Sequence, residues 1–244
     1  MYYSIKQIKK SLPQNKIADS SIWVNVWVRQ ASFPLTWFFI NLGFTANSVS
    51  FLAIVVSLLA SVCFAIPATG FMVTGVILIN LWLVLDCVDG NMARCQGRKS
   101  VYGGFVDAMS GYYTLGFVYL ALGIHVYFNG GIVIDSLNPW LLVAGAVTSI
   151  SDILSRLIYS KFCRANQIEG QLVRQEEEGR LSKIRKRIGV ELGISGLFMP
   201  LAILCAFFNA YDLMVAFYFL FNVVALGATT LVYYVKANRF DNGK

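Results

Sequence analysis

Charged residues are scarce in this sequence of 244 residues, of which 14% are Asp, Glu, Lys or Arg and 57% are hydrophobic. A soluble domain carries roughly 25% charged residues. The apolar residues gather in long runs between about residues 31 and 236. This composition excludes a soluble multidomain protein and predicts an integral membrane protein that crosses the bilayer several times.

Histidine and paired cysteines are also rare. The single histidine, His125, lies in the apolar stretch LGIHVYF, and the five cysteines include no CxxC pair. Zinc sites built on histidine need more than one imidazole, and isolated cysteines usually pack as small apolar residues. We therefore expect His125 to be a packed or interfacial residue. We expect no cleavable signal peptide, because the first 20 residues are polar and basic.

A helix needs about 18 to 25 apolar residues to cross the hydrocarbon core of a membrane. Six segments approach this length, at residues 48–66, 71–95, 102–128, 139–162, 190–209 and 211–236. Ahead of them, residues 21–43 are apolar but interrupted by polar residues and a proline. This pattern favours an amphipathic helix on the membrane surface over a seventh crossing. The predicted fold is therefore all-α, with six transmembrane helices preceded by an N-terminal amphipathic juxtamembrane helix.

The basic residues support this topology. All 20 Lys and Arg residues fall in the N-terminal arm, the second connection, residues 156–187 or the tail, and the alternate connections have none. Six crossings place these regions on one face, which the positive-inside rule makes cytoplasmic, together with both termini. The net charge of +7 thus reflects topology and attraction to anionic headgroups, and it does not indicate a nucleic-acid partner. We expect an arm and surface helix at 1–46, a membrane domain at 47–236 with a polar insert at about 163–189, and a tail at 237–244.

An acidic motif, LDCVDGNMARCQGRKSVYGGFVDAMSG, lies at residues 85–111. Offsets of 0, 3, 4, 7 and 8 residues place one set of side chains on a single helix face, namely Asp86, Asp89, Gly90, Ala93 and Arg94. Gly103 and Asp107 share a face of the next helix, since they are four residues apart. A short connection between the two helices can bring Asp107 opposite Asp86 and Asp89.

Ionisable side chains inside a membrane are costly and usually serve a function. Three carboxylates that converge at low dielectric repel one another, and an oxygen-only cluster favours a hard divalent cation such as Mg²⁺, Mn²⁺ or Ca²⁺. Mg²⁺ is commonly shared between carboxylates and substrate phosphates, and Arg94 can neutralise a phosphate oxygen. The motif therefore predicts a ligand with a pyrophosphate. The alternatives are structural ion pairs with nearby basic residues, or a cation carrier, although a carrier would place its carboxylates near the bilayer midplane.

The motif resembles the signature of the CDP-alcohol phosphotransferases (CDP-alcohol phosphatidyltransferases), Asp-x2-Asp-Gly-x2-Ala-Arg-x8-Gly-x3-Asp-x3-Asp. The sequence matches this signature at seven positions, Asp86, Asp89, Gly90, Ala93, Arg94, Gly103 and Asp107. The stretch TANSVS at residues 45–50 is similar to the Thr-Pro-Asn-x2-Thr sequence at which the family's first helix begins. Here Ala46 replaces the proline and Ser50 replaces the second threonine.

The resemblance implies a membrane-embedded enzyme of lipid or lipid-linked biosynthesis. It would transfer a substituted phosphate group from a CDP-linked donor to an alcohol or phosphate acceptor and release CMP. Two divalent ions, Mg²⁺ or Mn²⁺, would be held by Asp86, Asp89 and Asp107. The CDP moiety would contact Asn47, Gly90, Arg94 and Ser100, while Ala93 and Gly103 leave space for it. The resemblance also implies a homodimer in a membrane of the bacterial inner-membrane type.

The sequence departs from the signature at its last position, where Gly111 replaces the aspartate. In the family that aspartate is a metal ligand and the base for the acceptor, and a general base contributes about 10² to 10⁴-fold. Asp107 is then the remaining catalytic candidate in the motif. Three hypotheses follow: the acceptor is already ionised, as a phosphate monoester is; another carboxylate, Asp152 or Glu191, substitutes; or the protein binds CDP and metal with weak or no transfer. Asp152 has an alternative role as the partner of Arg156 in an i,i+4 ion pair. Glu191 has an alternative role as a charge near a helix N-terminus.

Overall fold

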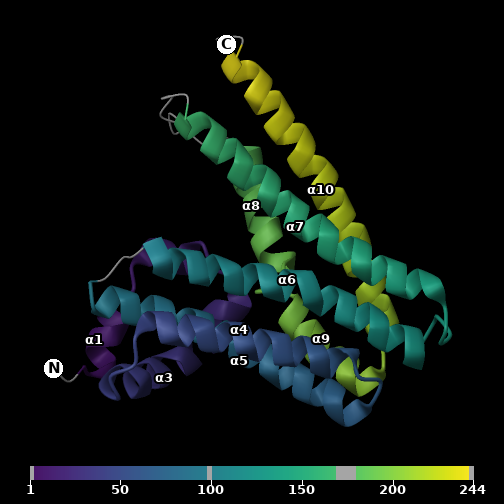
Figure 1. Ribbon diagram of the computed structural model, residues 1–244, viewed down its shortest axis with the longest axis horizontal. Coiled ribbons are helices and arrows are strands. Elements are labelled where there is room, and N and C mark those ends of the chain that lie inside the picture. The colour runs from purple at the N-terminus through teal and green to yellow at the C-terminus, as the bar shows by residue number, and fades with distance from the viewer. Residues whose placement is uncertain (1–2, 98–100, 169–179, 242–244) are drawn as a thin grey trace.

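The computed structural model describes residues 3–97, 101–168 and 180–241, and the regular structure of these residues is helical throughout (Figure 1). The N-terminal part contains α1 (Ile5–Lys10), α2 (Gln14–Ala18), the π-helix η1 (Val24–Val28) and α3 (Arg29–Asn41). The longer helices that follow are α4 (Ala46–Ala65), α5 (Thr69–Cys95), α6 (Val101–Asn129) and α7 (Pro139–Ile168). The chain ends with α8 (Arg180–Leu192), α9 (Phe198–Phe208) and α10 (Tyr211–Asp241).

Four helices in the described part of the chain are long and apolar enough to cross a membrane. They span Ala46–Ala65, Thr69–Cys95, Pro139–Ala165 and Tyr211–Arg239, which coincide with the first, second, fourth and sixth predicted crossings. The prediction of an all-helical membrane protein is therefore confirmed. The number six stays a prediction, for two physical reasons. In α6, tyrosines, glycines and His125 lower the hydropathy, and in the fifth segment a break between Leu192 and Phe198 leaves an apolar helix of only 11 residues.

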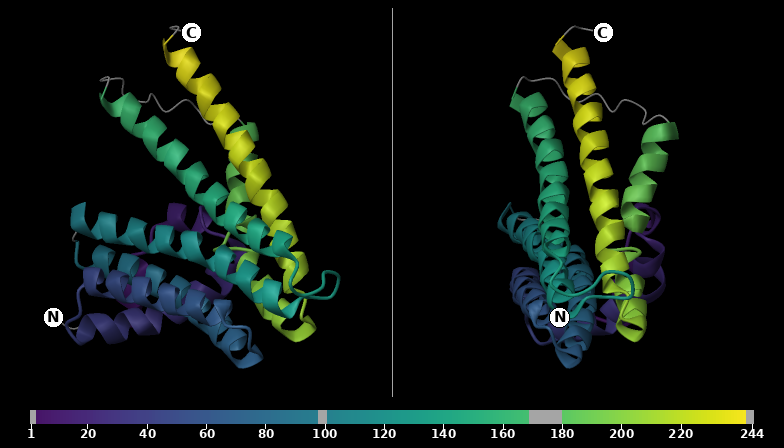
Figure 2. Two further views of the ribbon diagram at one scale, coloured as in Figure 1. Left: turned by 45° about the vertical axis from the view of Figure 1, so that its right-hand side comes forward. Right: turned by 90° about the vertical axis from the view of Figure 1, so that its right-hand side faces the viewer.

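The helices form two groups that diverge from a common crossing. α4 packs along both α5 and α6, α6 packs on α7, and α7 packs on α10. Figures 1 and 2 show α7 and α10 leaning away from α6 as they run toward Ile168 and Asp241. At the crossing of α6 and α7 the backbones touch: a Cβ on Gly123 would lie 2.9 Å from the Leu141 carbonyl oxygen, and one on Gly145 would lie 2.7 Å from that of Tyr119. Small residues permit this close approach of two helices.

The predicted surface segment at residues 21–43 is helical, as η1 followed by α3, and α3 packs against α5. Its outer side exposes aromatic residues, including Trp27 and Trp37. On its inner side the buried Arg29 donates to Asn25 Oδ1 at 2.9 Å and to the Lys16 carbonyl oxygen at 2.7 Å. These bonds join η1 and α3 to the N-terminal arm. The position of the segment at a membrane surface stays a prediction.

At the opposite end of the bundle, Asp212 fastens the α6–α7 connection to the start of α10. Its side chain is fully buried and accepts backbone N–H groups from Ile132, Val133 and Ile134 at 3.2, 2.8 and 3.0 Å. His125, near the C-terminal end of α6, is buried at the same end of the bundle. Its Nδ1 lies 3.4 Å from the Ile66 carbonyl oxygen, and its ring is edge-on to that of Tyr211. The expectation of a packed histidine is therefore confirmed.

We expect Asp212→Ala to lower the free energy of unfolding by about 3 kcal/mol, because three N–H groups lose a charged acceptor. Chemical unfolding of the purified protein in detergent micelles measures this. Asp135→Ala is the matched control, since Asp135 is exposed in the same connection, and it should change stability by less than about 0.5 kcal/mol. Equal losses in the two variants would contradict the assigned role.

Candidate active site between helices α4, α5 and α6

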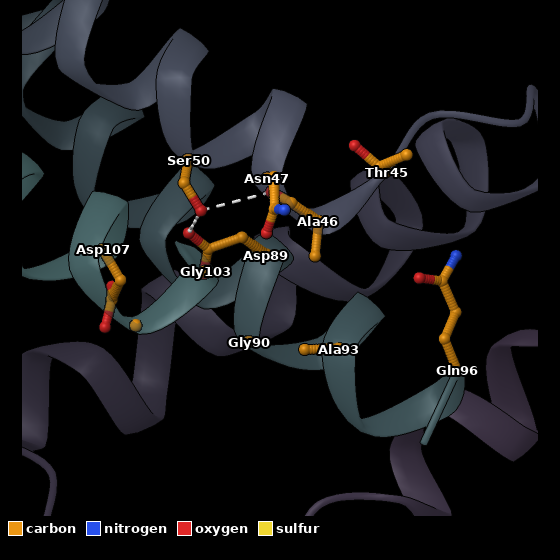
Figure 3. Close-up of a pocket in the computed structure, with 11 residues that line it drawn as sticks. Thr45, Ala46, Asn47, Ser50, Asp89, Gly90, Ala93, Gln96, Gly103 and Asp107 are labelled. Carbon is orange, nitrogen blue, oxygen red and sulfur yellow. Dashed lines mark hydrogen bonds between the residues drawn. The ribbon is translucent and has the colours of Figure 1, made fainter. Parts of the chain in front are cut away.

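A cavity of about 550 Å³ opens where α4 begins, beside the C-terminal half of α5 and the start of α6. Thr45 caps α4 by accepting the backbone N–H of Ser48 at 3.1 Å. The N-terminal end of α4, where the helix dipole is positive, therefore lies at this cavity. The lining residues, most of which Figure 3 labels, are Thr45, Ala46, Asn47, Ser50, Asp89, Gly90, Ala93, Gln96, Gly103, Gly104 and Asp107. We call it the first cavity.

Asp89 is bonded to a neutral side chain in this cavity. Its carboxylate is buried and accepts the hydroxyl of Ser50, with 2.5 Å between Ser50 Oγ and Asp89 Oδ2 (Figure 3). Ser50 is buried on α4, and its Oγ also lies 3.2 Å from the Ala46 carbonyl oxygen. The bond between Ser50 and Asp89 thus links the first turn of α4 to α5 at the wall of the cavity.

Arg94 turns away from the carboxylates. Its Nη2 donates to Asn91 Oδ1 at 2.7 Å, and Asn91 in turn donates to the buried hydroxyls of Ser32 and Thr36 on α3, both at 3.1 Å. The guanidinium lies over Gly90, since a Cβ at that position would be 3.3 Å from Arg94 Nη1. Gly90 also lines the first cavity, so the side chain of Arg94 lies directly beside the cavity wall. Arg94 Nε is buried and has no hydrogen-bond partner in the described ranges.

A second cavity, of about 300 Å³, also includes Asp107 among its lining residues. It is lined by Trp82, Leu83, Asp86, Asp107, Ala108, Gly111, Tyr112, Leu115, Arg156, Ile194 and Ser195. The carboxyl groups of Asp86 and Asp107 are close enough to interact. Trp82 Nε1 donates to Ser110 Oγ at 2.9 Å and so fixes α5 against α6 at this cavity. Asp107 therefore contributes to the walls of both cavities.

The profile of the CDP-alcohol phosphatidyltransferase family matches residues 43–169, from just before α4 to just past the end of α7. The chain belongs to the CDP-alcohol phosphatidyltransferase family. Among curated proteins, no sequence matches it significantly. The family transfers a phosphate-linked group from a CDP-alcohol, and the four apolar helices indicate that this member is an integral membrane protein.

In this member of the family, the structure brings most of the predicted site residues together. Those at the first cavity are Asn47, Asp89, Gly90, Ala93, Gly103 and Asp107, and those at the second are Asp86, Asp107 and Gly111. Ser100 lies outside the described residues. Arg94 lies beside the first cavity but does not line it.

The two candidate substitutes for the missing aspartate are each paired with an arginine. Asp152 Oδ1 lies 3.5 Å from Arg156 Nε, which confirms the i,i+4 pair as its role in this structure. Glu191 pairs with Arg187 and accepts the backbone N–H of Ile22 at 3.1 Å. Neither residue lines the first or the second cavity.

Sequence reasoning missed several polar side chains at the cavities. Gln96 could have been found, because it follows Asp89 by seven residues and therefore shares its helix face. Arg156 comes from α7, and Ser195 comes from the break between α8 and α9. No spacing within the motif could have placed these two residues beside Asp107.

Within the described residues, Asp86, Asp89 and Asp107 form no ion pair. Asp89 is buried, Asp86 is half-buried and Asp107 is exposed to the cavities. The ion pairs found within the described ranges involve other acids, Asp19, Asp152 and Glu191. In the same ranges, no three side chains of His, Cys, Asp or Glu converge on one point as a metal site. The site thus has excess negative charge, held as neighbouring carboxylates rather than as a closed ligand cage.

We expect Asp86→Asn to stabilise the protein in the presence of EDTA, because the substitution removes repulsion between Asp86 and its neighbours. The expected rise in Tm is roughly 3 °C, which corresponds to about 1 kcal/mol for a chain of this size. Asp19→Asn, at an exposed acid paired with Lys186, is the control and should give no rise. A lower Tm for Asp86→Asn would show that the carboxylate is a structural contact.

Proposed function

We propose that the protein is a divalent-metal-dependent CDP-alcohol phosphotransferase that binds its CDP-linked donor in the first cavity and its acceptor in the second. The observation that carries this proposal is the position of Asp107, which lines both cavities. A donor and an acceptor bound on its two sides would meet beside its carboxylate. The reaction forms a bond between the acceptor and the phosphorus attached to the donor alcohol, and it releases CMP.

The first cavity suits a nucleoside diphosphate. Its volume of about 550 Å³ falls in the range of small-molecule sites, roughly 300 to 1,000 Å³. The start of α4 offers backbone N–H groups and a positive dipole to phosphate oxygens. Asn47 and Gln96 add side-chain amides on either side (Figure 3). Arg94 stands beside the cavity, where its Nη2 donates to Asn91 Oδ1, and its positive charge in that position would favour the same phosphates.

The unpartnered acids fit a divalent cation in charge and in donor chemistry. Asp86, Asp89 and Asp107 would hold Mg²⁺ or Mn²⁺ as pairs of carboxylates, with substrate phosphates completing the coordination. A bound ion supplies charge neutralisation at the phosphates during transfer. Ser50 keeps the Asp89 carboxylate oriented through its hydroxyl. Six crossings, cytoplasmic termini, a homodimer and an inner-membrane location stay predictions from the sequence and the family resemblance.

Gly111 supports a second candidate function. A glycine in the second cavity, where the family has an aspartate, gives no base for a hydroxyl acceptor. The alternative is therefore a family member that binds CDP and metal with impaired or altered catalysis. The two candidates share the first cavity and differ only in what the second cavity can activate.

The decisive experiment is CMP release by the purified protein with Mg²⁺ or Mn²⁺, over a panel of CDP-linked donors and of hydroxyl and phosphate acceptors. We expect Asp86→Asn, Asp89→Asn and Asp107→Asn each to lower the rate by about 100-fold or more, with Asp19→Asn as the unaffected control. Unchanged release in Asp86→Asn would refute the metal assignment. A wild type that is silent with every acceptor, together with an active Gly111→Asp variant, would favour the alternative function.

CDP binding can be measured without turnover. We expect CDP to raise the Tm only when a divalent ion is present, because the ion and the pyrophosphate complete each other's coordination. Equal stabilisation by CDP in EDTA would contradict a shared site.

The contact between Asn91 and Arg94 provides a further test. We expect Asn91→Ala to weaken CDP binding by about five- to tenfold, since Arg94 loses its orienting acceptor, a change of about 1 kcal/mol. Asn80→Ala is the matched control on the same helix; its amide oxygen accepts Trp23 Nε1 at 3.3 Å, away from the first cavity. Titration of CDP followed by the shift in Tm compares the two variants, and equal weakening would assign the effect to helix packing.

A further inference from the structure

The second cavity has one cationic side chain among the residues that line it, Arg156 of α7. The guanidinium is half-exposed and is oriented by Asp152 one turn earlier, at 3.5 Å between Arg156 Nε and Asp152 Oδ1. Its two Nη groups have no bonded partner in the described part of the chain. Asp86 and Asp107 line the same cavity but lie beyond ion-pair distance from Arg156. Arg156 therefore offers a positioned fork of donors to an incoming anion, and phosphate suits that geometry.

The same cavity offers no free base. Its acids are Asp86 and Asp107, which the proposed function assigns to the cation. Asp152 and Glu191 are each held by an arginine. His125, the single imidazole of the chain, lies among other residues near the α6–α7 connection. An alcohol must lose a proton during attack, and these residues give that proton no acceptor.

Gly111 adds space in addition to removing a carboxylate. A Cβ built on this residue meets no atom within 4 Å, so the cavity is open at the position where the family has its aspartate. An anion bound at Arg156 thus meets neither a side chain nor a negative charge at residue 111. A phosphate monoester has a second pKa of about 6 and is largely a dianion at neutral pH, so it needs no base.

We propose that the acceptor is a phosphate monoester, bound by Arg156 in the second cavity, whose own phosphate oxygen attacks the donor. This inference rests on the proposed function and specifies its acceptor. The attacking oxygen forms a P–O bond to the phosphorus attached to the donor alcohol, and the bond from that phosphorus to the CMP oxygen breaks. CMP leaves with the electron pair, and no proton changes place. The product joins the two alcohols through a pyrophosphate bridge.

The experiment uses an acceptor that has a phosphate and no hydroxyl. Wild-type protein in detergent micelles receives CDP-diacylglycerol or CDP-glycerol, Mn²⁺, and one of three acceptors: n-butyl phosphate, glycerol or glycerol 3-phosphate. We expect CMP release with n-butyl phosphate and background release with glycerol. ³¹P NMR of the product should show the coupled pair of resonances of a phosphoanhydride rather than the single resonance of a phosphodiester.

Variants at two positions sharpen the test. Arg156→Gln should raise the KM for n-butyl phosphate by about tenfold or more and leave the CDP-dependent rise in Tm intact, which also shows that the variant is folded. Arg164→Gln, at an exposed arginine on the same helix, is the matched control and should keep the wild-type KM. Gly111→Asp should lower the use of n-butyl phosphate, because it places a carboxylate in the anion's cavity, and should permit the use of glycerol.

Three outcomes would overturn the inference. Equal rates of CMP release with glycerol and with n-butyl phosphate would show that a hydroxyl is activated without an aspartate at position 111. Reaction of glycerol 3-phosphate alone, with a phosphodiester product, would show that the phosphate only anchors an attacking hydroxyl. No CMP release with any of the three acceptors would also reject the inference. If CDP still binds with Mn²⁺ in that case, the proposed donor site is retained. If CDP does not bind, the proposed function itself is rejected.

Discussion

Uncompensated negative charge on the facing sides of α5 and α6 is the constraint on which the rest of this site depends. Packing of α4 against both helices holds Asp86, Asp89 and Asp107 near one another. The nearest arginine in sequence, Arg94, is bound to Asn91 instead. Carboxylates arranged in this way cost stability at low dielectric. A protein retains such an arrangement when binding of a charged ligand offsets the lost stability, because functional sites commonly reduce the stability of the free protein.

Hydrogen bonds from neutral side chains connect several of the helices that form the walls of the two cavities. Ser50 orients Asp89, Trp82 binds Ser110, and Asn91 binds two hydroxyls of α3. The N-terminal segment also reaches the second cavity, because Ser21 Oγ donates at 2.6 Å to the carbonyl oxygen of Ser195. That bond attaches the segment between α8 and α9 to the N-terminal part of the chain. Residues 21–41 are therefore part of the scaffold of the site as well as a candidate membrane-surface element.

The sequence predicted the parts of the structure that follow from helical periodicity. The offsets of Asp89, Gly90 and Ala93 placed them on one face, and all three line the first cavity. Periodicity could not predict Arg94, because its orientation depends on a hydrogen bond to Asn91 and, through it, on α3. It could not predict Arg156 or Ser195 either, because tertiary packing brings their segments to Asp107. Hydropathy was a weaker guide where a helix is lined by tyrosines, as α6 is, or interrupted, as between α8 and α9.

The close contact of α6 and α7 at Gly123 and Gly145 affects the two cavities differently. The first cavity is built from α4, α5 and α6 alone, whereas the second also takes Arg156 from α7. Arg156 follows Gly145 by eleven residues, about 16 Å along the helix axis, so a rotation of about 5° at the crossing moves it by roughly 1.4 Å relative to Asp107. Displacements of that size change the alignment of reacting groups. A change in the crossing angle of α6 and α7 would therefore move one wall of the second cavity and leave the walls of the first cavity in place.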